Sequence, residues 1–346
     1  MDKRTFLSAS QVLSSLLILA ALLSLGCERQ QQTTGKKTRV VVYTAIENEE
    51  LAECKPLMEK AMPDLEIVFT RLSTGDITAR LLAEKNNPQA DAIWCVAASS
   101  MMIFEREGML DPYAPEGLES ILPTFKSPKT PPTWVGMDAY VTAFCVNTVR
   151  AKELNLPIPT SWADLTNSVY KGHIVMPNPA SSGTGFMSVS SVLQGMGEAK
   201  GWEYLRALHQ NMAQYTKSGS KPAKMAADGE YPIAISIAFV GAKLKSEGAP
   251  LEIVLPNEGA GYEVEANALV KGAKNADGAR RFLDWAISDE AMSVYAKYLG
   301  IMAKPGFTPP EGMPENVSER LFKMDFQWSA DNRDAVLEKW ATLFGG

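Results

Sequence analysis

Short apolar runs alternate along the chain with longer segments whose apolar residues recur at helical spacing. Val40–Tyr43 is an apolar, β-branched run typical of a buried parallel strand. Glu49–Met62 places apolar residues every three or four positions, as one face of a helix does. The alternation continues with a strand at Leu65–Phe69, a helix at Asp76–Asn86 and a strand at Ala92–Val96. This order predicts an open parallel sheet with helices on its faces.

A second set of alternating elements occupies the middle of the chain. It comprises strands at Ile174–Met176, Ile233–Ile237 and Ile253–Leu255, with helices at Trp202–Asn211 and Pro222–Ala227 between them. Strand-like segments at Tyr140–Val146 and Ala266–Val270 lie at the two ends of this set, which lets the chain leave one lobe and return to it. Helical patterns at Ala276–Ile287 and Ala335–Phe344 follow.

We therefore predict an α/β protein of two lobes, each a mainly parallel sheet flanked by helices and joined by two crossing segments. Lobe 1 comprises residues 39–141 and 265–346, and lobe 2 comprises residues 142–264. Two such lobes form a cleft, and ligands of open α/β sheets bind beyond the carboxyl ends of the strands. The residues that follow each strand are therefore the candidates for a binding site.

The N-terminal residues have the features of a secretory signal. Lys3 and Arg4 precede a short apolar run, Val12–Leu25, which ends at Gly26 and Cys27. The pattern resembles a bacterial lipoprotein signal, although Ser24 stands where that signal usually has leucine. We expect a signal peptide at 1–26, lipidation of Cys27 and a flexible polar tether at 27–38. The protein would then be periplasmic or at the cell surface, anchored to a membrane; an uncleaved anchor or an ordinary cleaved signal is the alternative.

Composition narrows the classes of function. The 346 residues are 46% hydrophobic and 21% charged, which is ordinary for a globular protein, and the formal net charge is −6. With no basic stripe and no Cys/His cluster in the sequence, we expect no nucleic-acid partner. Cys54, Cys95 and Cys145 show no close spacing, so we interpret them as buried free thiols. We also expect no metal, no cofactor and a monomer.

Several of the segments that follow a strand are rich in hydroxyl groups and glycine and stand where a helix should begin. Helix starts offer free N–H groups and partial positive charge, and hydroxyls add hydrogen-bond donors, so this combination suits the oxygens of phosphate or phosphonate. Helix capping by serine and threonine is the alternative interpretation. The strongest segment is Ser181–Gly185, whose run of small residues exceeds what one cap requires. The candidates from these segments are Tyr43, Thr44, Glu47, Ser73, Thr74, Ser99, Ser182, Gly183, Thr184, Ser218, Ser236 and Phe239.

Catalysis finds little support in the sequence. The two histidines, His173 and His209, lie at a strand start and within a predicted helix. The chain has no Gly-x-Ser-x-Gly elbow, no His-Glu-x-x-His and no Cys-x-x-Cys motif. A phosphatase that uses the same loops is the rival from the enzyme class, and we expect a binding protein instead.

Three segments carry a resemblance to a known family: Ser73–Ile77, Asn87–Trp94 and Met176–Gly185. They resemble the type II periplasmic binding proteins of the ferric-ion and phosphonate cluster, and within it the 2-aminoethylphosphonate-binding component of ABC transporters. The resemblance implies capture of a small anionic ligand and delivery to an ABC transporter permease. Ferric-binding members carry two adjacent tyrosines where this chain has Ser236–Val240, which argues against direct iron binding. A hexose phosphate, or ferric ion with a synergistic anion, is the alternative ligand.

An aminoethylphosphonate would need a carboxylate for its ammonium group, because an unpaired charge in a closed cleft is costly. Three acids lie near a strand end or a lobe crossing: Glu47, Glu265 and Asp138, in our order of preference. Tyr43, Trp94, Tyr140 and Phe239 could enclose the short carbon chain, with a place in the core as the alternative for Trp94, which lies inside a predicted strand.

Overall fold

A computed structural model describes residues 37–314 and 317–345. The expected signal peptide, Cys27 and nearly all of the tether lie outside the described residues. Residues 38–346 form one compact unit. None of the described helices is long and apolar enough to cross a membrane.

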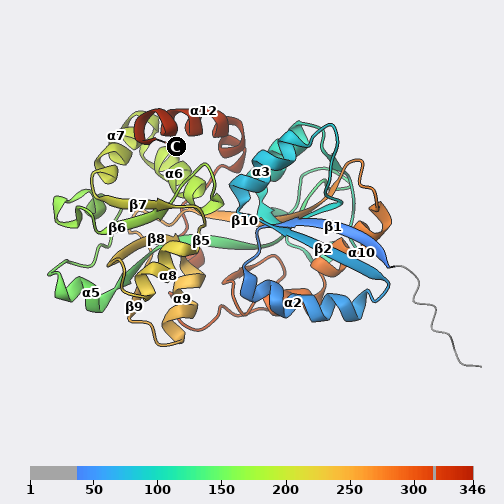
Figure 1. The fold of residues 1–346 in the computed structure, drawn as a ribbon, viewed down its shortest axis with the longest axis horizontal. Coiled ribbons are helices and arrows are strands. Elements are labelled where there is room, and N and C mark those ends of the chain that lie inside the picture. The colour runs from blue at the N-terminus through green and yellow to red at the C-terminus, as the bar shows by residue number, and fades with distance from the viewer. Residues whose placement is uncertain (1–36, 315–316, 346) are drawn as a thin grey trace, which may run out of the picture. The chain divides into compact units, whose positions relative to one another are not determined.

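One mixed sheet organises this unit (Figure 1). Its path runs β2 (Leu65–Arg71), β1 (Thr38–Thr44), β3 (Ala92–Ala97), β10 (Tyr262–Val270), β5 (Val135–Asn147), β8 (Ile233–Ile237), β6 (Ile174–Pro177) and β7 (Met212–Thr216). The short strands β4 (Leu110–Asp111), β9 (Leu251–Val254) and β11 (Ile301–Met302) pair with β10 or β5. The strands β2, β1 and β3 are parallel to one another, as are β7, β6 and β8. The predicted α/β class with two parallel sets of strands is confirmed.

Strand β5 joins the two halves of the sheet. All 13 of its residues are buried. Its first part pairs with β10, up to Val141, and its second part, from Thr142, pairs with β8. The crossing segment expected at Tyr140–Val146 is therefore part of a longer strand. Since β10 borders β5 along this crossing, side chains from both strands lie between the two parallel sets of strands.

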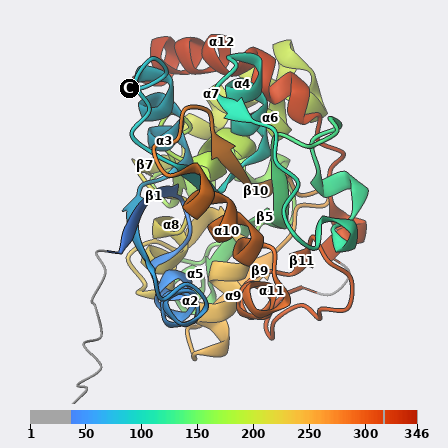
Figure 2. The ribbon, with the colours of Figure 1, turned by 90° about the vertical axis from the view of Figure 1, so that its right-hand side faces the viewer.

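Helices cover both halves of the sheet (Figures 1 and 2). The first half has α2 (Asn48–Ala61), α3 (Thr74–Ala83), α4 (Ala98–Arg106), α10 (Ala276–Ala286) and α11 (Asp289–Tyr295). The second half has α5 (Thr148–Glu153), α6 (Gly183–Met196), α7 (Glu198–His209), α8 (Lys221–Ala227) and α9 (Ala238–Ser246). Helix α12 (Phe326–Phe344) ends the chain, and 3₁₀ turns occupy Leu118–Ser120, Pro123–Phe125, Ala163–Thr166, Ser168–Tyr170 and Val317–Arg320.

The C-terminal helix contacts both halves. Val336 and Trp340 of α12 pack into the core of the second half, where Trp340 meets Tyr215 edge to face at 5.2 Å. At the other end of the helix, Asp331 forms an ion pair with Arg106 of α4 at 2.8 Å. We assigned residues 265–346, and with them α12, to lobe 1 alone, whereas α12 contacts both halves. The lobe boundaries stay a prediction.

Trp94 is the centre of the aromatic packing in the first half. Its ring meets Phe282 edge to face at 5.5 Å, and its indole N–H donates to the hydroxyl of Tyr295 at 3.1 Å. The Tyr295 hydroxyl in turn donates to the carbonyl of Ala286 at 3.2 Å. These bonds satisfy polar atoms that are buried between β3 and the helices α10 and α11.

We expect Tyr295→Phe to lower the free energy of unfolding by about 1–3 kcal/mol, because it leaves the buried Trp94 N–H without an acceptor. Tyr231→Phe is the matched control, since the half-buried Tyr231 hydroxyl has no hydrogen-bond partner among the described residues. Urea denaturation measures both variants. Equal stabilities would contradict the role given to Tyr295.

Candidate ligand-binding site

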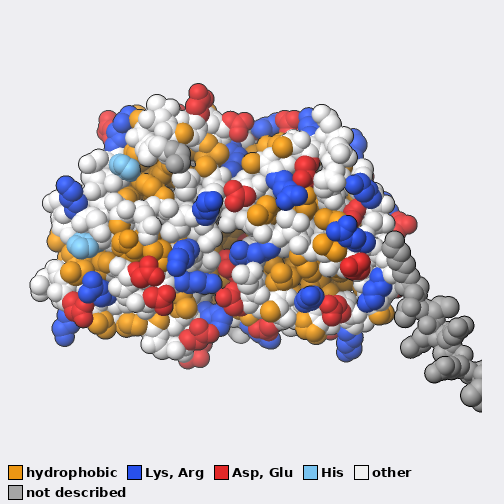
Figure 3. All heavy atoms as spheres, viewed as in Figure 1, with side chains coloured by type: hydrophobic (Ala, Val, Ile, Leu, Met, Phe, Trp, Pro, Cys, Tyr) orange, Lys and Arg blue, Asp and Glu red, His pale blue; other side chains and the backbone are white. Residues whose placement is uncertain are grey.

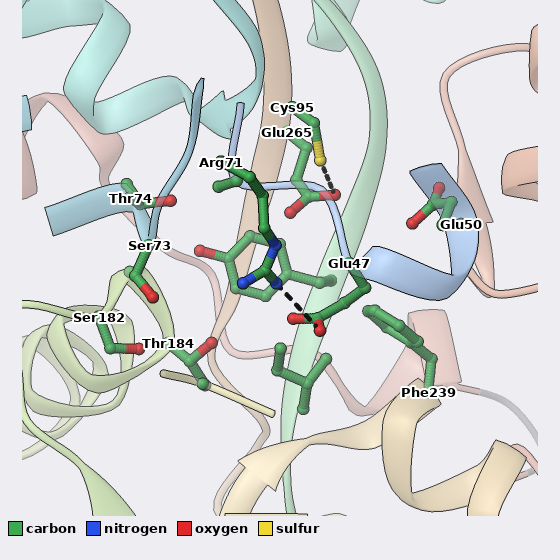
Figure 4. A pocket seen from close by; sticks show the side chains of 15 residues that line it. Glu47, Glu50, Arg71, Ser73, Thr74, Cys95, Ser182, Thr184, Phe239 and Glu265 are labelled. Atoms are coloured by element: carbon green, nitrogen blue, oxygen red, sulfur yellow. Dashed lines mark hydrogen bonds and ion pairs between the residues drawn. The ribbon is translucent and has the colours of Figure 1, made fainter. Parts of the chain in front are cut away.

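A cavity lies where the strand ends of the two halves meet (Figure 4). Its wall is formed by Ala45, Glu47, Glu50, Arg71, Ser73, Thr74, Cys95, Tyr140, Ser182, Gly183, Thr184, Gly219, Ile237, Phe239 and Glu265. Figure 3 shows basic and acidic side chains gathered around the middle of the face seen in Figure 1. The cavity volume of about 40 Å³ has room for about three water molecules, so the two halves are close together around it.

Two helix starts from different halves of the protein meet at this cavity. Ser73 precedes α3, and Ser182 precedes α6 and accepts a hydrogen bond from the Gly185 N–H at 3.3 Å. The Gly75 N–H donates to the Ser181 carbonyl at 3.0 Å, which links the two helix starts directly. A Cβ atom on Gly75 would lie 2.2 Å from the Ala180 carbonyl oxygen, so this approach requires glycine.

Four hydroxyl groups face the cavity without a protein partner. Among the described residues, the side-chain hydroxyls of Ser73, Thr74, Tyr140 and Thr184 make no hydrogen bond. Thr74, Tyr140 and Thr184 are nevertheless buried. Polar groups of buried residues are normally hydrogen-bonded, so these three hydroxyls, together with that of the half-buried Ser73, indicate a place for the polar atoms of a ligand.

An ion pair occupies the middle of the cavity (Figure 4). Arg71, the last residue of β2, lies 3.1 Å from a Glu47 carboxylate oxygen and donates to the Ile46 carbonyl at 2.8 Å. The same Glu47 oxygen accepts from the Ser220 hydroxyl of the other half at 3.1 Å. Burial raises the pKa of Glu47, and the charge of Arg71 opposes this rise. Arg71 was not among the candidates, because the strand was predicted to end at Phe69 and instead extends to Arg71, which lines the cavity.

Two further carboxyl groups line the wall beyond the ion pair. Glu265 on β10 accepts a hydrogen bond from the Cys95 thiol at 3.1 Å, and Glu50 on α2 is buried. Burial raises the pKa of Glu265 to about 7 and that of Glu50 well above its usual range. Neither residue was a candidate. We interpreted Cys95 as a buried free thiol and the acids of the predicted helix, Glu50 included, as a solvated face; for Glu50 that interpretation is wrong, because its side chain is buried. The cavity thus combines unpaired hydroxyls, one cation and three carboxyl groups.

The structure brings most of the candidate residues together on this wall: Glu47, Ser73, Thr74, Tyr140, Ser182, Gly183, Thr184, Phe239 and Glu265. The other candidates do not line the cavity: Tyr43, Thr44, Ser99, Asp138, Ser218 and Ser236.

Hydrogen bonds within the protein account for several of the side chains off the wall. The Tyr43 hydroxyl donates to Glu84 at 3.0 Å, and the Ser99 hydroxyl donates to Glu263 at 2.6 Å. Thr44 accepts from the Ile46 N–H at 3.1 Å. The Ser236 hydroxyl donates to the Gly219 carbonyl at 2.6 Å, so it fixes a loop that does line the wall. Asp138 of β5 pairs directly with Glu265 of β10 and does not line the cavity.

Comparison with known proteins places the chain in a family. The model for bacterial extracellular solute-binding proteins matches residues 88–322. The chain belongs to this family. A protein of Haemophilus influenzae described as uncharacterized is 33% identical, over 94% of this chain and 96% of its own. A probable ABC transporter periplasmic-binding protein of Sinorhizobium fredii is 25% identical, over 68% of this chain and 66% of its own.

Solved structures agree with this family. The periplasmic binding protein AfuA from Actinobacillus pleuropneumoniae, with fructose 6-phosphate bound, is 32% identical, with a TM-score of 0.82 over 89% of this chain and 99% of that one. The periplasmic binding protein P5PA is 28% identical, with a TM-score of 0.80 over 89% and 100%. The ferric ion-binding protein A of Pasteurella haemolytica, 18% identical with a TM-score of 0.71 over 89% and 99%, shares the fold.

The protein is therefore a periplasmic solute-binding protein of an ABC transporter with the two-lobed type II fold. This confirms the expected class of protein, its fold and the partnership with a permease. The family and its neighbours serve transport and are not enzymes. The expected phosphonate ligand stays a prediction.

We expect Gly75→Ala to weaken ligand binding about tenfold or more, equivalent to about 1.4 kcal/mol, because the added methyl group forces the two helix starts apart. Gly195→Ala in α6 is the control, since its Cβ would meet only the Phe322 ring, at 3.5 Å. Calorimetric titration with a panel of small phosphate and phosphonate compounds measures both variants. If the two variants bind alike, the close approach at Gly75 does not matter for binding.

Proposed function

We propose that this binding protein captures a small molecule that carries a phosphate or phosphonate group, with a sugar phosphate as the first candidate. The observation that carries the proposal is the group of four unpartnered hydroxyls, from Ser73, Thr74, Tyr140 and Thr184, at the junction of two helix starts. Both helices are long enough to contribute a partial positive charge, with 10 residues in α3 and 14 in α6.

The anionic head would lie between these two helix starts. Helix N-termini leave their first N–H groups without intrahelical partners, and such groups bind phosphate oxygens readily. The hydroxyls of Ser73 and Thr184 would add donors from opposite halves, so the ligand would hold the lobes closed. Arg71, whose guanidinium lies in the middle of the cavity beside Glu47, would supply a charge-assisted hydrogen bond.

The rest of the cavity suits a molecule with hydroxyl groups. Glu47, our first choice for an ammonium group, is already paired with Arg71 and with Ser220. Glu50 and Glu265 are acids whose pKa is raised by burial, and carboxyl groups of this kind exchange hydrogen bonds with hydroxyls. The similarity to AfuA, whose structure contains fructose 6-phosphate, supports the same choice.

Aminoethylphosphonate is the second candidate, on a specific observation. Glu265 forms no ion pair with a basic side chain among the described residues, so it could accept an ammonium group. Ferric ion with an anion has less support, because the stretch 236–240 has no tyrosine and Phe239 lies on the wall. Lipidation of Cys27 would keep the receptor near its permease, and this too is a proposal.

Calorimetric titration of the purified protein tests the ligand class. We expect fructose 6-phosphate or glucose 6-phosphate to bind at least about tenfold more tightly than inorganic phosphate, through contacts of the sugar. Tighter binding of aminoethylphosphonate than of either sugar phosphate would favour the second candidate. Heat from ferric ion alone would overturn the proposal.

Single hydroxyls can be tested in the same assay. Thr184→Val should weaken binding of the sugar phosphate about tenfold or more, because a hydrogen bond to a charged group contributes about 1.5–3 kcal/mol. Thr184→Ser keeps the hydroxyl and should bind within about threefold of the wild type. Ser182→Ala should also weaken binding; an unchanged affinity there would mean that Ser182 is only the cap of α6. If Thr184→Val binds as the wild type does, the anion is not held at this helix start.

A further inference from the structure

Asp138 is a buried carboxyl group that the proposed function does not use. It lies on β5 with none of its surface exposed, and neither of its side-chain oxygens receives a hydrogen bond from a described donor. Its direct cross-strand neighbour is Glu265 of β10. Side chains of directly opposed residues lie on the same face of a sheet, so the two carboxyl groups are adjacent.

Local features of the backbone turn Glu265 toward the cavity. The register between β10 and β5 shifts between Glu265 and Ala266, as it does in a β-bulge, and bulges re-aim side chains. The Cys95 thiol approaches from β3, where Cys95 adopts a φ of 56°, a conformation that non-glycine residues rarely take. The Glu265 carboxyl group therefore lines the cavity and also interacts with the side chains of Cys95 and Asp138.

Two adjacent buried carboxylates cannot both keep their charge without a cation between them. The titratable and charged groups around the pair are Glu47, Glu50, Arg71, Cys95, Tyr140 and Glu263. The one cation among them, Arg71, is paired with Glu47. Burial first, and then the charges of Glu265 and Glu50, raise the pKa of Asp138 well above its usual range.

We propose that Asp138 stays protonated and is a positioning residue, whose O–H donates to Glu265 and holds that carboxylate toward a hydroxyl or ammonium group of the ligand. Glu265 is then the residue that determines specificity at the far end from the anionic head. This inference rests on the proposed function, because it places the anion at the helix starts and the ligand's hydrogen-bond donor at Glu265.

The arrangement sets a direction for the pH dependence of binding. Glu265 accepts from the ligand when it is ionised, so binding weakens as the pH falls through its pKa of about 7. The second ionisation of the ligand's phosphate, near about pH 6, acts in the same direction in every variant. Only a shift of the profile between variants therefore reports on Glu265.

Two substitutions of Asp138 test whether it acts as a hydrogen-bond donor to Glu265. Asp138→Asn replaces the O–H donor with an N–H donor, so affinity for fructose 6-phosphate should stay within about threefold and the pH midpoint should not move. Asp138→Leu removes the donor; affinity should fall about tenfold and the midpoint should move to higher pH. Inorganic phosphate, which reaches only the helix starts, should bind both variants as it binds the wild type. Aminoethylphosphonate in parallel titrations shows whether an ammonium group is read in the same way.

An infrared measurement without ligand keeps the inference separate from the ligand assignment. The band of protonated carboxylic acids at neutral pH should lose intensity in Asp138→Asn relative to the wild type. Failure of every phosphorylated compound to bind the wild type would overturn the proposed function, and the infrared band would still decide the state of Asp138. An Asp138→Asn variant that loses affinity as Asp138→Leu does, or an unchanged band, would overturn the inference.

Discussion

The contact between the starts of α3 and α6 is the constraint on which the rest of the site depends. A single backbone hydrogen bond, from Gly75 to Ser181, joins the two halves at this point. Glycine at position 75 permits the approach, and the same closeness brings Thr74 next to Gly183. The hydroxyls and N–H groups of both helix starts thereby converge on one small volume. Neither half alone would surround an anion there, which ties ligand capture to closure of the lobes.

The opposite side of the cavity has the reverse character. Glu47, Glu50 and Glu265 supply acceptors and acids, and Arg71 offsets the charge of only one of them. Burial raises the pKa of Glu50 and Glu265 and so favours their protonated forms. The wall can therefore exchange hydrogen bonds with a ligand without placing several negative charges next to its anionic group. A molecule with an anionic head and a hydrogen-bonding remainder satisfies both sides at once.

The sequence predicted those residues of the site that lie in the turn between a strand and the helix that follows it. Ser73 and Thr184 were found because a strand, a short hydroxyl-rich turn and a helix start recur along the chain, and each feature can be read within about ten residues. Cys95 and Glu50 were missed because their side chains reach the cavity from inside a strand and a helix. Arg71 was missed because β2 extends to Arg71, beyond the end that we predicted at Phe69. Tyr43 was a candidate by position, but its hydroxyl bonds to Glu84, a partner 41 residues away. The last strand of the second half was expected at Ile253–Leu255 and spans Leu251–Val254, since its pairing with β5 decides its ends.

A crystal structure of the protein with fructose 6-phosphate would test the central claim most directly. The account predicts the phosphate between the two helix starts, with its oxygens within about 3 Å of the Ser73 and Thr184 hydroxyls. It also predicts a sugar hydroxyl against Glu265. A phosphate bound elsewhere in the cleft, with the hydroxyls of Ser73, Thr74, Tyr140 and Thr184 still unpartnered, would contradict it.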